Sequence, residues 1–232
     1  MKVVILAGGF GTRLSEYTDT IPKPMVPIGG KPIIEHIMNF YSNYGHNEFF
    51  IALGYKGEEI KKYFNNLKND WKINLIDTGA NTLTGGRLKR LEKFLLKETF
   101  LLTYGDGISN ININELIEFH RSHKKMVTVS AVRPPARFGA LSLDGSNVLK
   151  FREKKQLGES WINGGFFVIN PTFFQYLKGD GTVLEKEPLE KMTEIKELKA
   201  FKHEGFWQCM DHKLDKDYLE ELIISKKAPW IK

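Results

Sequence analysis

The sequence has 232 residues, of which 41% are hydrophobic and 27% charged, a composition typical of a globular chain that buries one substantial core. The one cysteine, Cys209, excludes an intrachain disulfide, and no apolar run is long enough to span a bilayer. Lysine and arginine number 34 against 28 acidic residues, an excess that suits small anionic substrates and nucleic acid alike. We expect a cytoplasmic protein, because the first residues resemble a core strand rather than a signal peptide.

The chain opens with an apolar, β-branched strand at residues 2–6 that runs into the glycine-rich residues 8–11. This is how a buried parallel strand meets a phosphate-binding loop. Glycine removes the Cβ where the backbone has to approach a ligand closely and turn its N–H groups toward it. Arg13, and Lys23 within Pro-Lys-Pro-Met, add positive charge. The pattern predicts a triphosphate site.

Two better-known glycine motifs do not fit this stretch. The dinucleotide fingerprint needs a third glycine where Leu14 stands, and leucine is too large for close packing of helix on strand. The P-loop ends in Gly-Lys-Ser/Thr, whereas Pro32 follows Gly30 and Lys31 here. A glycine-rich turn without a ligand is the remaining alternative, and the ordered succession of strand, glycines, arginine and lysine disfavours it.

Beyond the loop, apolar periodicity predicts alternating strands and helices through the first half of the chain. This order favours parallel pairing of the strands. The expected helices are residues 32–44, 58–65 and 112–123, and the expected strands are residues 48–53, 72–77, 100–104 and 126–133.

The second half changes character. Strands at residues 139–143 and 148–154 flank the turn signal Asp144-Gly145-Ser146, which indicates a hairpin. A strand at 162–170, helices at 172–178 and 187–196, a strand at 198–203 and a last helix near 213–225 follow. We predict one α/β domain over residues 1–232. It would have a Rossmann-like, mostly parallel sheet flanked by helices, with antiparallel insertions on the side where a second substrate, the acceptor, would bind. Residues 1–125 would form a nucleotide-binding half, and residues 126–232 an acceptor-binding half with the C-terminal helix.

Two aspartates are candidate metal ligands. A triphosphate-using transferase needs a divalent cation, which binds hard oxygen ligands. Asp106 directly follows a buried strand between two glycines, and so it should project at the carboxyl edge of the sheet, where α/β proteins bind ligands. Asp211 is a weaker second candidate. An ordinary Asp-Gly turn at Asp106 and a helix cap at Asp211 are the alternatives.

Further motifs lie in order along nearly the whole chain. They are DTG at 77–79, TGGRLKR at 84–90, YGDG at 104–107, RFGAL at 137–141, INGGFF at 162–167, EPL at 187–189 and GFWQ at 205–208. Together with the glycine loop, these motifs resemble the nucleotide-diphospho-sugar pyrophosphorylases, also called sugar-phosphate nucleotidyltransferases, and most of all their glucose-1-phosphate cytidylyltransferase branch.

This resemblance implies an enzyme that transfers CMP from CTP to a phosphorylated acceptor such as glucose 1-phosphate, with Mg²⁺, making a nucleotide sugar for polysaccharide biosynthesis. It implies catalytic roles for Arg13 and Lys23. The implied nucleotide contacts are Leu6, Ala7, Gly8, Gly9, Gly11, Thr12, Arg13, Thr82, Arg87 and Asp106. The implied acceptor contacts are Glu153, Lys154 and Asn163, and the implied magnesium ligands are Asp106 and Asp211.

The acceptor side departs from the family pattern. Lys155 follows Glu153 and Lys154 where the family has proline, and Trp161 places a large apolar plane beside Asn163. We therefore add Trp161 to the acceptor site, where it would reshape the pocket. The alternative is that Trp161 packs at the edge of the sheet.

Several interpretations of the function stay open. In one of them, CTP is kept and the acceptor is another sugar phosphate or a phosphorylated non-sugar. In another, the nucleotide substrate carries thymine or guanine, because the glycine loop is common to these enzymes. A third is a non-catalytic nucleotide-binding regulator, which the intact Arg13, Lys23, Asp106 and Asp211 disfavour. The sequence lacks a stripe of interleaved basic and aromatic residues, so we expect no nucleic-acid partner. We also expect no membrane partner, and we expect a homo-oligomer.

Overall fold

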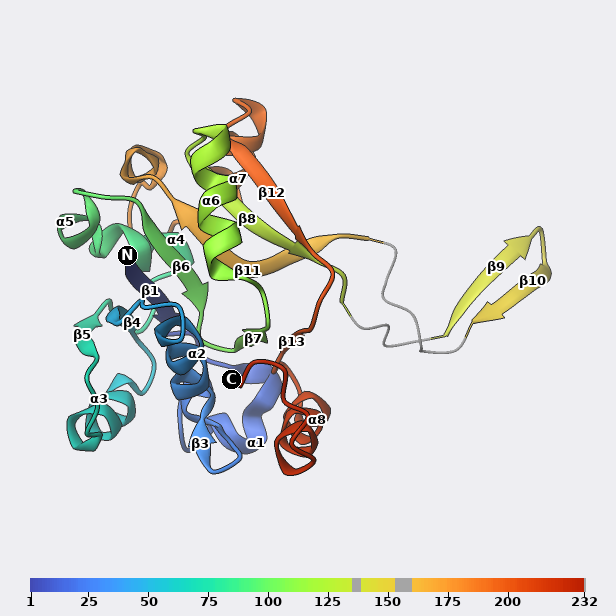
Figure 1. The fold of residues 1–232 in the computed structure, drawn as a ribbon, viewed down its shortest axis with the longest axis horizontal. Helices are drawn as coiled ribbons and strands as arrows, with labels where there is room; N and C mark the ends of the chain where they lie inside the picture. Colours follow the sequence, from blue (N-terminus) through green and yellow to red (C-terminus); the bar gives the residue numbers. More distant parts are fainter. Residues whose placement is uncertain (135–138, 153–159, 232) are drawn as a thin grey trace.

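The fold is built on a seven-stranded sheet with β1 near its centre (Figure 1). A computed structural model describes residues 1–134, 139–152 and 160–231. The strand order is β12-β8-β11-β6-β1-β4-β5. The strands are β1 (Lys2–Ala7), β4 (Glu48–Leu53), β5 (Lys72–Asp77), β6 (Phe100–Tyr104), β8 (Val127–Val132), β11 (Ile162–Ile169) and β12 (Leu198–His203).

The sheet is mixed but mostly parallel, as the sequence predicts. Strand β1 pairs in parallel with β4 and with β6, and β4 pairs in parallel with β5. Strand β11 runs antiparallel to both β6 and β8, and β12 is again parallel to β8. One continuous sheet therefore includes strands from both halves of the chain.

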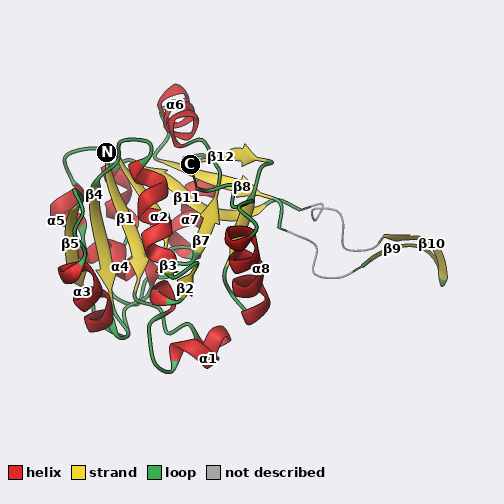
Figure 2. Cartoon of the chain, turned by 60° about the horizontal axis from the view of Figure 1, so that its bottom comes forward, coloured by secondary structure: helices red, strands yellow, loops and turns green. Residues whose placement is uncertain are grey.

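Helices cover both faces of the sheet (Figure 2). Val3 and Ile5 of β1 face one core with α2 (Ile33–Ser42), α3 (Gly57–Asn66), α6 (Ile113–His123) and α8 (Lys213–Ile224). Val4 and Leu6 face the other core with α4 (Thr84–Arg90), α5 (Glu92–Leu95) and α7 (Glu187–Glu194). The strict alternation along β1 explains why nearly all of this strand is apolar.

The predicted helix at 172–178 is wrong in type. Residues Pro171–Tyr176 form a 3₁₀ helix, because the Asn170 side chain accepts the Thr172 N–H and Phe173 and Phe174 are both buried under a tight turn. Helix α4 is absent from the prediction, since Gly85 and Gly86 are poor helix formers. The other predicted helices are confirmed, with ends that differ by at most two residues.

Smaller pieces complete the chain. Strands β7 (Gly107–Ser109) and β13 (Trp207–Cys209) pair antiparallel and bring distant segments together. The predicted hairpin is confirmed as β9 (Ala140–Asp144) and β10 (Asn147–Arg152), which lie apart from the main body in Figure 1. The remaining short elements are β2 (Pro27–Ile28), β3 (Lys31–Pro32), α1 (Ser15–Thr18) and 3₁₀ turns at Thr12–Leu14 and Lys23–Met25. Among the described helices, none combines the length and apolar character that a membrane crossing requires.

Replacing Ile5 by alanine tests the central position of β1. Ile5 is fully buried, so Ile5→Ala should lower the free energy of unfolding by about 2–5 kcal/mol through lost burial and a cavity. Ile224→Ala is the matched control, because Ile224 is 75% exposed on α8 and should change the same quantity by less than about 0.5 kcal/mol. Urea denaturation measures both, and equal losses would contradict this description of the core.

Candidate active site

A cavity of about 550 Å³ lies at the carboxyl ends of β1 and β6. This is the edge where α/β sheets bind ligands. Residues 6–13, 80–84, 103–107 and 163–165 line it, together with Lys23, Pro24, Arg87, Trp207, Cys209 and Asp211. The lining includes every residue that the resemblance assigns to the nucleotide.

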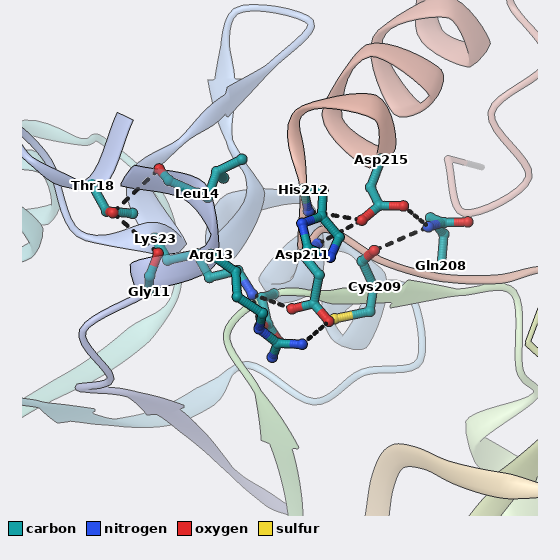
Figure 3. A network of polar contacts seen from close by, with 11 residues as sticks. Gly11, Arg13, Leu14, Thr18, Lys23, Gln208, Cys209, Asp211, His212 and Asp215 are labelled. Atoms are coloured by element: carbon teal, nitrogen blue, oxygen red, sulfur yellow. Dashed lines mark hydrogen bonds and ion pairs between the residues drawn. The ribbon is translucent and has the colours of Figure 1, made fainter. Parts of the chain in front are cut away.

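The glycine loop is fixed at one end and open at the other. Gly11 has a left-handed φ of 67°, and a Cβ there would lie 2.9 Å from the Thr18 methyl group. The Thr18 hydroxyl donates to the carbonyls of Gly11 and Leu14, 3.1 and 3.2 Å away (Figure 3). A Cβ on Gly9, by contrast, would have no heavy atom of the described residues within 4 Å beyond its own chain neighbours. A ligand can therefore approach the backbone at Gly9 while Gly11 holds the turn.

The buried Arg87 side chain packs against this loop and holds its backbone by hydrogen bonds. Its side chain is only 4% exposed, and a Cβ on Gly8 would lie 2.2 Å from the Arg87 Nη1. The guanidinium donates to the Thr78 hydroxyl at 2.8 Å. It also donates, at 2.7 to 3.1 Å, to the carbonyls of Gly8, Leu53, Gly79 and Ala80. Arg87 thus ties together the loops that follow β1, β4 and β5.

The most charged part of the cavity is a cluster around Lys23. The Lys23 ammonium lies 2.5 Å from an Asp106 carboxylate oxygen and 2.7 Å from an Asp211 oxygen. Arg13 donates to the other Asp211 oxygen at 2.8 Å (Figure 3). Burial opposes the charge on Lys23, but Asp106 and Asp211 outweigh it and raise the Lys23 pKa. For Asp211, burial is likewise outweighed, and Lys23 and Arg13 lower its pKa.

The pairing of β7 with β13 explains why the two aspartates meet. It places residues 207–209 alongside residues 107–109, and the Met210 N–H then donates to the Asp106 carbonyl at 2.9 Å. Asp215 accepts the N–H groups of Asp211 and His212 at 2.9 and 2.8 Å, so it caps helix α8. The Asp211 side chain is consequently free of the capping role and points toward Lys23.

This acidic group fits a divalent metal ion. Ligand atoms of Asp106, Cys209 and Asp211 lie within 4.8 Å of one another, and the two carboxylates supply the hard oxygen donors that such ions prefer. The Lys23 ammonium already provides a positive charge between them. Burial, and next the charge of Asp106, raise the Cys209 pKa, and its thiol donates to Asp211. A protonated thiol is a poor ligand, so the carboxylates carry the fit.

Asn163, which the resemblance assigns to the acceptor, lies in the cavity wall, and its amide donates to the Tyr104 hydroxyl at 3.3 Å. Trp161 is not among the described residues that line the cavity. Its ring instead lies 4.7 Å from the Arg133 guanidinium and 5.4 Å from the Lys202 ammonium, which matches the alternative of packing at the sheet edge. Glu153 and Lys154 lie outside the described residues.

Sequence reasoning missed several polar residues of the cavity wall, among them Thr84 and Tyr104. Both belong to motifs of the family resemblance, TGGRLKR and YGDG. A threonine and a tyrosine carry no charge pattern that marks them as functional. Their motifs were therefore the available signal.

Comparisons with known proteins agree with this geometry. Residues 2–211 match the family model described as nucleotidyl transferase. The chain is 47% identical to glucose-1-phosphate cytidylyltransferase of Salmonella typhi, over 99% of this chain and 98% of the relative. It is 45% identical to a probable glucose-1-phosphate cytidylyltransferase of Bacillus subtilis, over 91% of each.

Solved structures show the same fold. HddC from Yersinia pseudotuberculosis superposes with a TM-score of 0.76 at 28% identity, over 96% of this chain and 99% of HddC. A UDP-glucose pyrophosphorylase complexed with UDP-glucose superposes with a TM-score of 0.74, over 97% of this chain and 98% of its own, at 17% identity. Because the family model covers residues 2–211 and the Salmonella typhi enzyme is 47% identical over nearly the full length of both chains, this chain is a nucleotidyltransferase and belongs to the sugar-phosphate branch of the nucleotidyl transferase family.

Proposed function

We propose that this enzyme transfers CMP from CTP to a sugar 1-phosphate, glucose 1-phosphate being the first choice. The observation that carries the proposal is the cluster of Lys23, Asp106 and Asp211 facing an open glycine loop in one cavity. The substrates come from the 47% and 45% identical cytidylyltransferases. Guanyltransferases are more distant, at 31% identity for the Saccharomyces cerevisiae protein.

The reaction needs alignment and charge more than a protein nucleophile. The acceptor phosphate is largely a dianion near neutral pH, so one of its oxygens attacks the α-phosphorus of CTP directly. A bond forms from that oxygen to the α-phosphorus, the bond from the α-phosphorus to the bridging oxygen breaks, and pyrophosphate leaves. The backbone of the glycine loop and Arg13 hold the triphosphate, while Lys23 balances the charge of both phosphates.

Asp106 and Asp211 would hold Mg²⁺, which neutralises triphosphate charge when it is bound. Thr82, which is 6% exposed in the cavity wall, and Arg87 define the nucleotide side. Asn163 lies on the acceptor side. This division of roles rests on where the side chains lie and on the family resemblance.

A different phosphorylated acceptor is the second candidate. Lys155 departs from the family pattern and supports this candidate. Trp161 does not support it, because its ring packs against Arg133 and Lys202, away from the lining residues. The acceptor pocket is thus the part of the site that the family resemblance supports least.

We also propose that copies of this chain associate. Leu141, Leu143, Val148, Leu149 and Phe151 of the β9–β10 hairpin are each more than half exposed. A two-stranded hairpin is marginal by itself, and a contiguous exposed apolar face is typical of protein contacts. A second copy of this chain would cover this apolar face, as the expected homo-oligomer requires.

Pyrophosphate release by the purified protein with Mg²⁺ tests the proposed reaction. CTP, UTP, dTTP, ATP and GTP are each paired with glucose 1-phosphate, other sugar phosphates and phosphorylated non-sugars. We expect release with CTP and glucose 1-phosphate. Pyrophosphate release from CTP with another acceptor alone would change the assigned acceptor but keep the mechanism. No release with any pair, despite CTP binding, would favour a non-catalytic regulator.

Lys23→Ala should reduce kcat more than it weakens CTP binding. The Lys23 charge matters most where negative charge develops on the phosphates, which is in the transition state. We expect a loss of about 100-fold or more in kcat, the size seen for loss of one such stabilising group, with a smaller change in the Kd for CTP. Lys31→Ala, whose side chain is 58% exposed, is the control. Equal losses in binding and turnover would contradict this role.

Arg87→Lys should weaken CTP binding although it keeps the charge. One ammonium cannot replace the branched guanidinium that donates to five oxygens around the loops after β1, β4 and β5. We expect the Kd for CTP to rise about tenfold or more, by calorimetry, with a lower melting temperature. Arg90→Lys, in the same helix but 43% exposed, should change neither by much. No change in Arg87→Lys would show that the loops hold their shape without it.

A further inference from the structure

A segment that the proposed reaction leaves unused lies against the nucleotide side of the cavity. Residues 177–186, here called the strap, connect the 3₁₀ helix after β11 to α7. The Leu83 N–H donates to the Asp180 carbonyl at 2.9 Å, and the Gly86 N–H donates to the Thr182 carbonyl at 3.1 Å. A Cβ on Gly86 would lie 2.5 Å from the Asp180 carbonyl oxygen. The glycine pair in the first turn of α4 is therefore what lets the strap lie this close.

Glu185 of the strap binds side chains on both sides of the cavity. One of its carboxylate oxygens accepts the Thr84 hydroxyl at 2.7 Å, and the other accepts the Tyr104 hydroxyl at 2.5 Å. Thr84 also accepts the Leu184 N–H at 2.9 Å. Tyr104 in turn accepts the Asn163 amide at 3.3 Å. A continuous chain of hydrogen bonds thus runs from Thr84 through Glu185 and Tyr104 to Asn163.

The chemistry of each group fixes the direction of this chain. An ionised carboxylate only accepts, so both hydroxyl protons point to Glu185. The Tyr104 oxygen then has its lone pairs available for Asn163. Burial, followed by the charge of Glu185, raises the Tyr104 pKa and keeps the phenol protonated. Thr84, Tyr104 and Asn163 all line the cavity, whereas Glu185 is an exposed residue outside the lining.

We propose that Glu185 is a positioning residue that sets the nucleotide side and the acceptor side of the site in one shared geometry. It acts through Thr84 and Tyr104 rather than by contact with a reacting atom. The kinetic test of this inference rests on the proposed transfer reaction. The test on the unliganded protein does not depend on that reaction.

The kinetic test uses Glu185→Gln, Thr84→Val and Tyr104→Phe with CTP and glucose 1-phosphate, or the acceptor that the pyrophosphate assay selects. Glutamine offers one accepting oxygen atom in place of two and carries no negative charge, so E185Q weakens the hydrogen bonds that the two hydroxyls donate. We expect E185Q to raise both KM values about tenfold, the cost of a lost hydrogen bond to a charged group. T84V should raise mainly the KM for CTP, and Y104F mainly that for the acceptor.

Double variants separate coupling from independent damage. In the E185Q background, T84V should add no further loss in the KM for CTP, and Y104F none in the KM for the acceptor. Thr84→Ser retains the hydroxyl and should behave like the unchanged enzyme. Glu187→Gln is the matched control, since Glu187 lies two residues away and pairs with Lys178 at the exposed surface; both its KM values should stay within about twofold.

A measurement on the unliganded protein is independent of the reaction. With ¹³Cζ-labelled tyrosine, Y104F assigns the Tyr104 resonance, and T84V should shift that resonance in the wild-type background but not in E185Q. An inactive wild type with this pattern would overturn the proposed reaction and leave the coupling standing. Additive KM losses, an E185Q effect on one substrate alone, or a Tyr104 resonance insensitive to Thr84 would overturn the role of Glu185.

Discussion

The ion cluster of Lys23, Asp106 and Asp211 is the constraint on which the site depends. Its members come from the glycine-loop region, the end of β6 and the segment before α8, and the two aspartates stand 83 and 188 positions from Lys23 in the chain. Two carboxylates this close repel each other by about 4 kcal/mol at 4 Å and an effective dielectric constant near 20. A positive charge between them turns that repulsion into attraction, so the C-terminal segment can close against the amino-terminal loop.

The antiparallel strand β11 brings residues of the second half of the chain to the same cavity. Ligand sites in α/β sheets lie at the carboxyl ends of parallel strands, yet Asn163 stands at the beginning of β11. Because β11 runs against β6 and β8, its first residues reach the same edge as the last residues of β6. The reversal therefore brings the INGG motif to the edge already occupied by Asp106.

Much of the fold was predictable because buried strands appear as short apolar runs whatever their neighbours are. The strands at 48–53 and 100–104 have the predicted bounds for this reason, and the strand at 72–77, which lies at the sheet edge and is only partly buried, has them as well. Helix α4 was not predictable from periodicity. Its glycines allow close contact with the strap, which lies about 100 residues further along the chain. The same limit applies to side chains. A helix cap was the alternative for the candidate metal ligand Asp211, and Asp215 fills the capping role instead. The EPL motif drew attention to Glu187, whereas Glu185 makes the contacts across the cavity.

The β9–β10 hairpin differs from the sheet in what holds it in shape. Strand β1 is enclosed by two cores, so its amide hydrogens should exchange with solvent only through large-scale opening. The hairpin has its apolar face in water, and whatever covers that face stabilises it by mass action. Under the proposed association of copies, its amide exchange would slow directly as protein concentration rises, whereas β1 would slow only through the gain in overall stability. The stability of this one segment would then depend on protein concentration as well as on its own sequence.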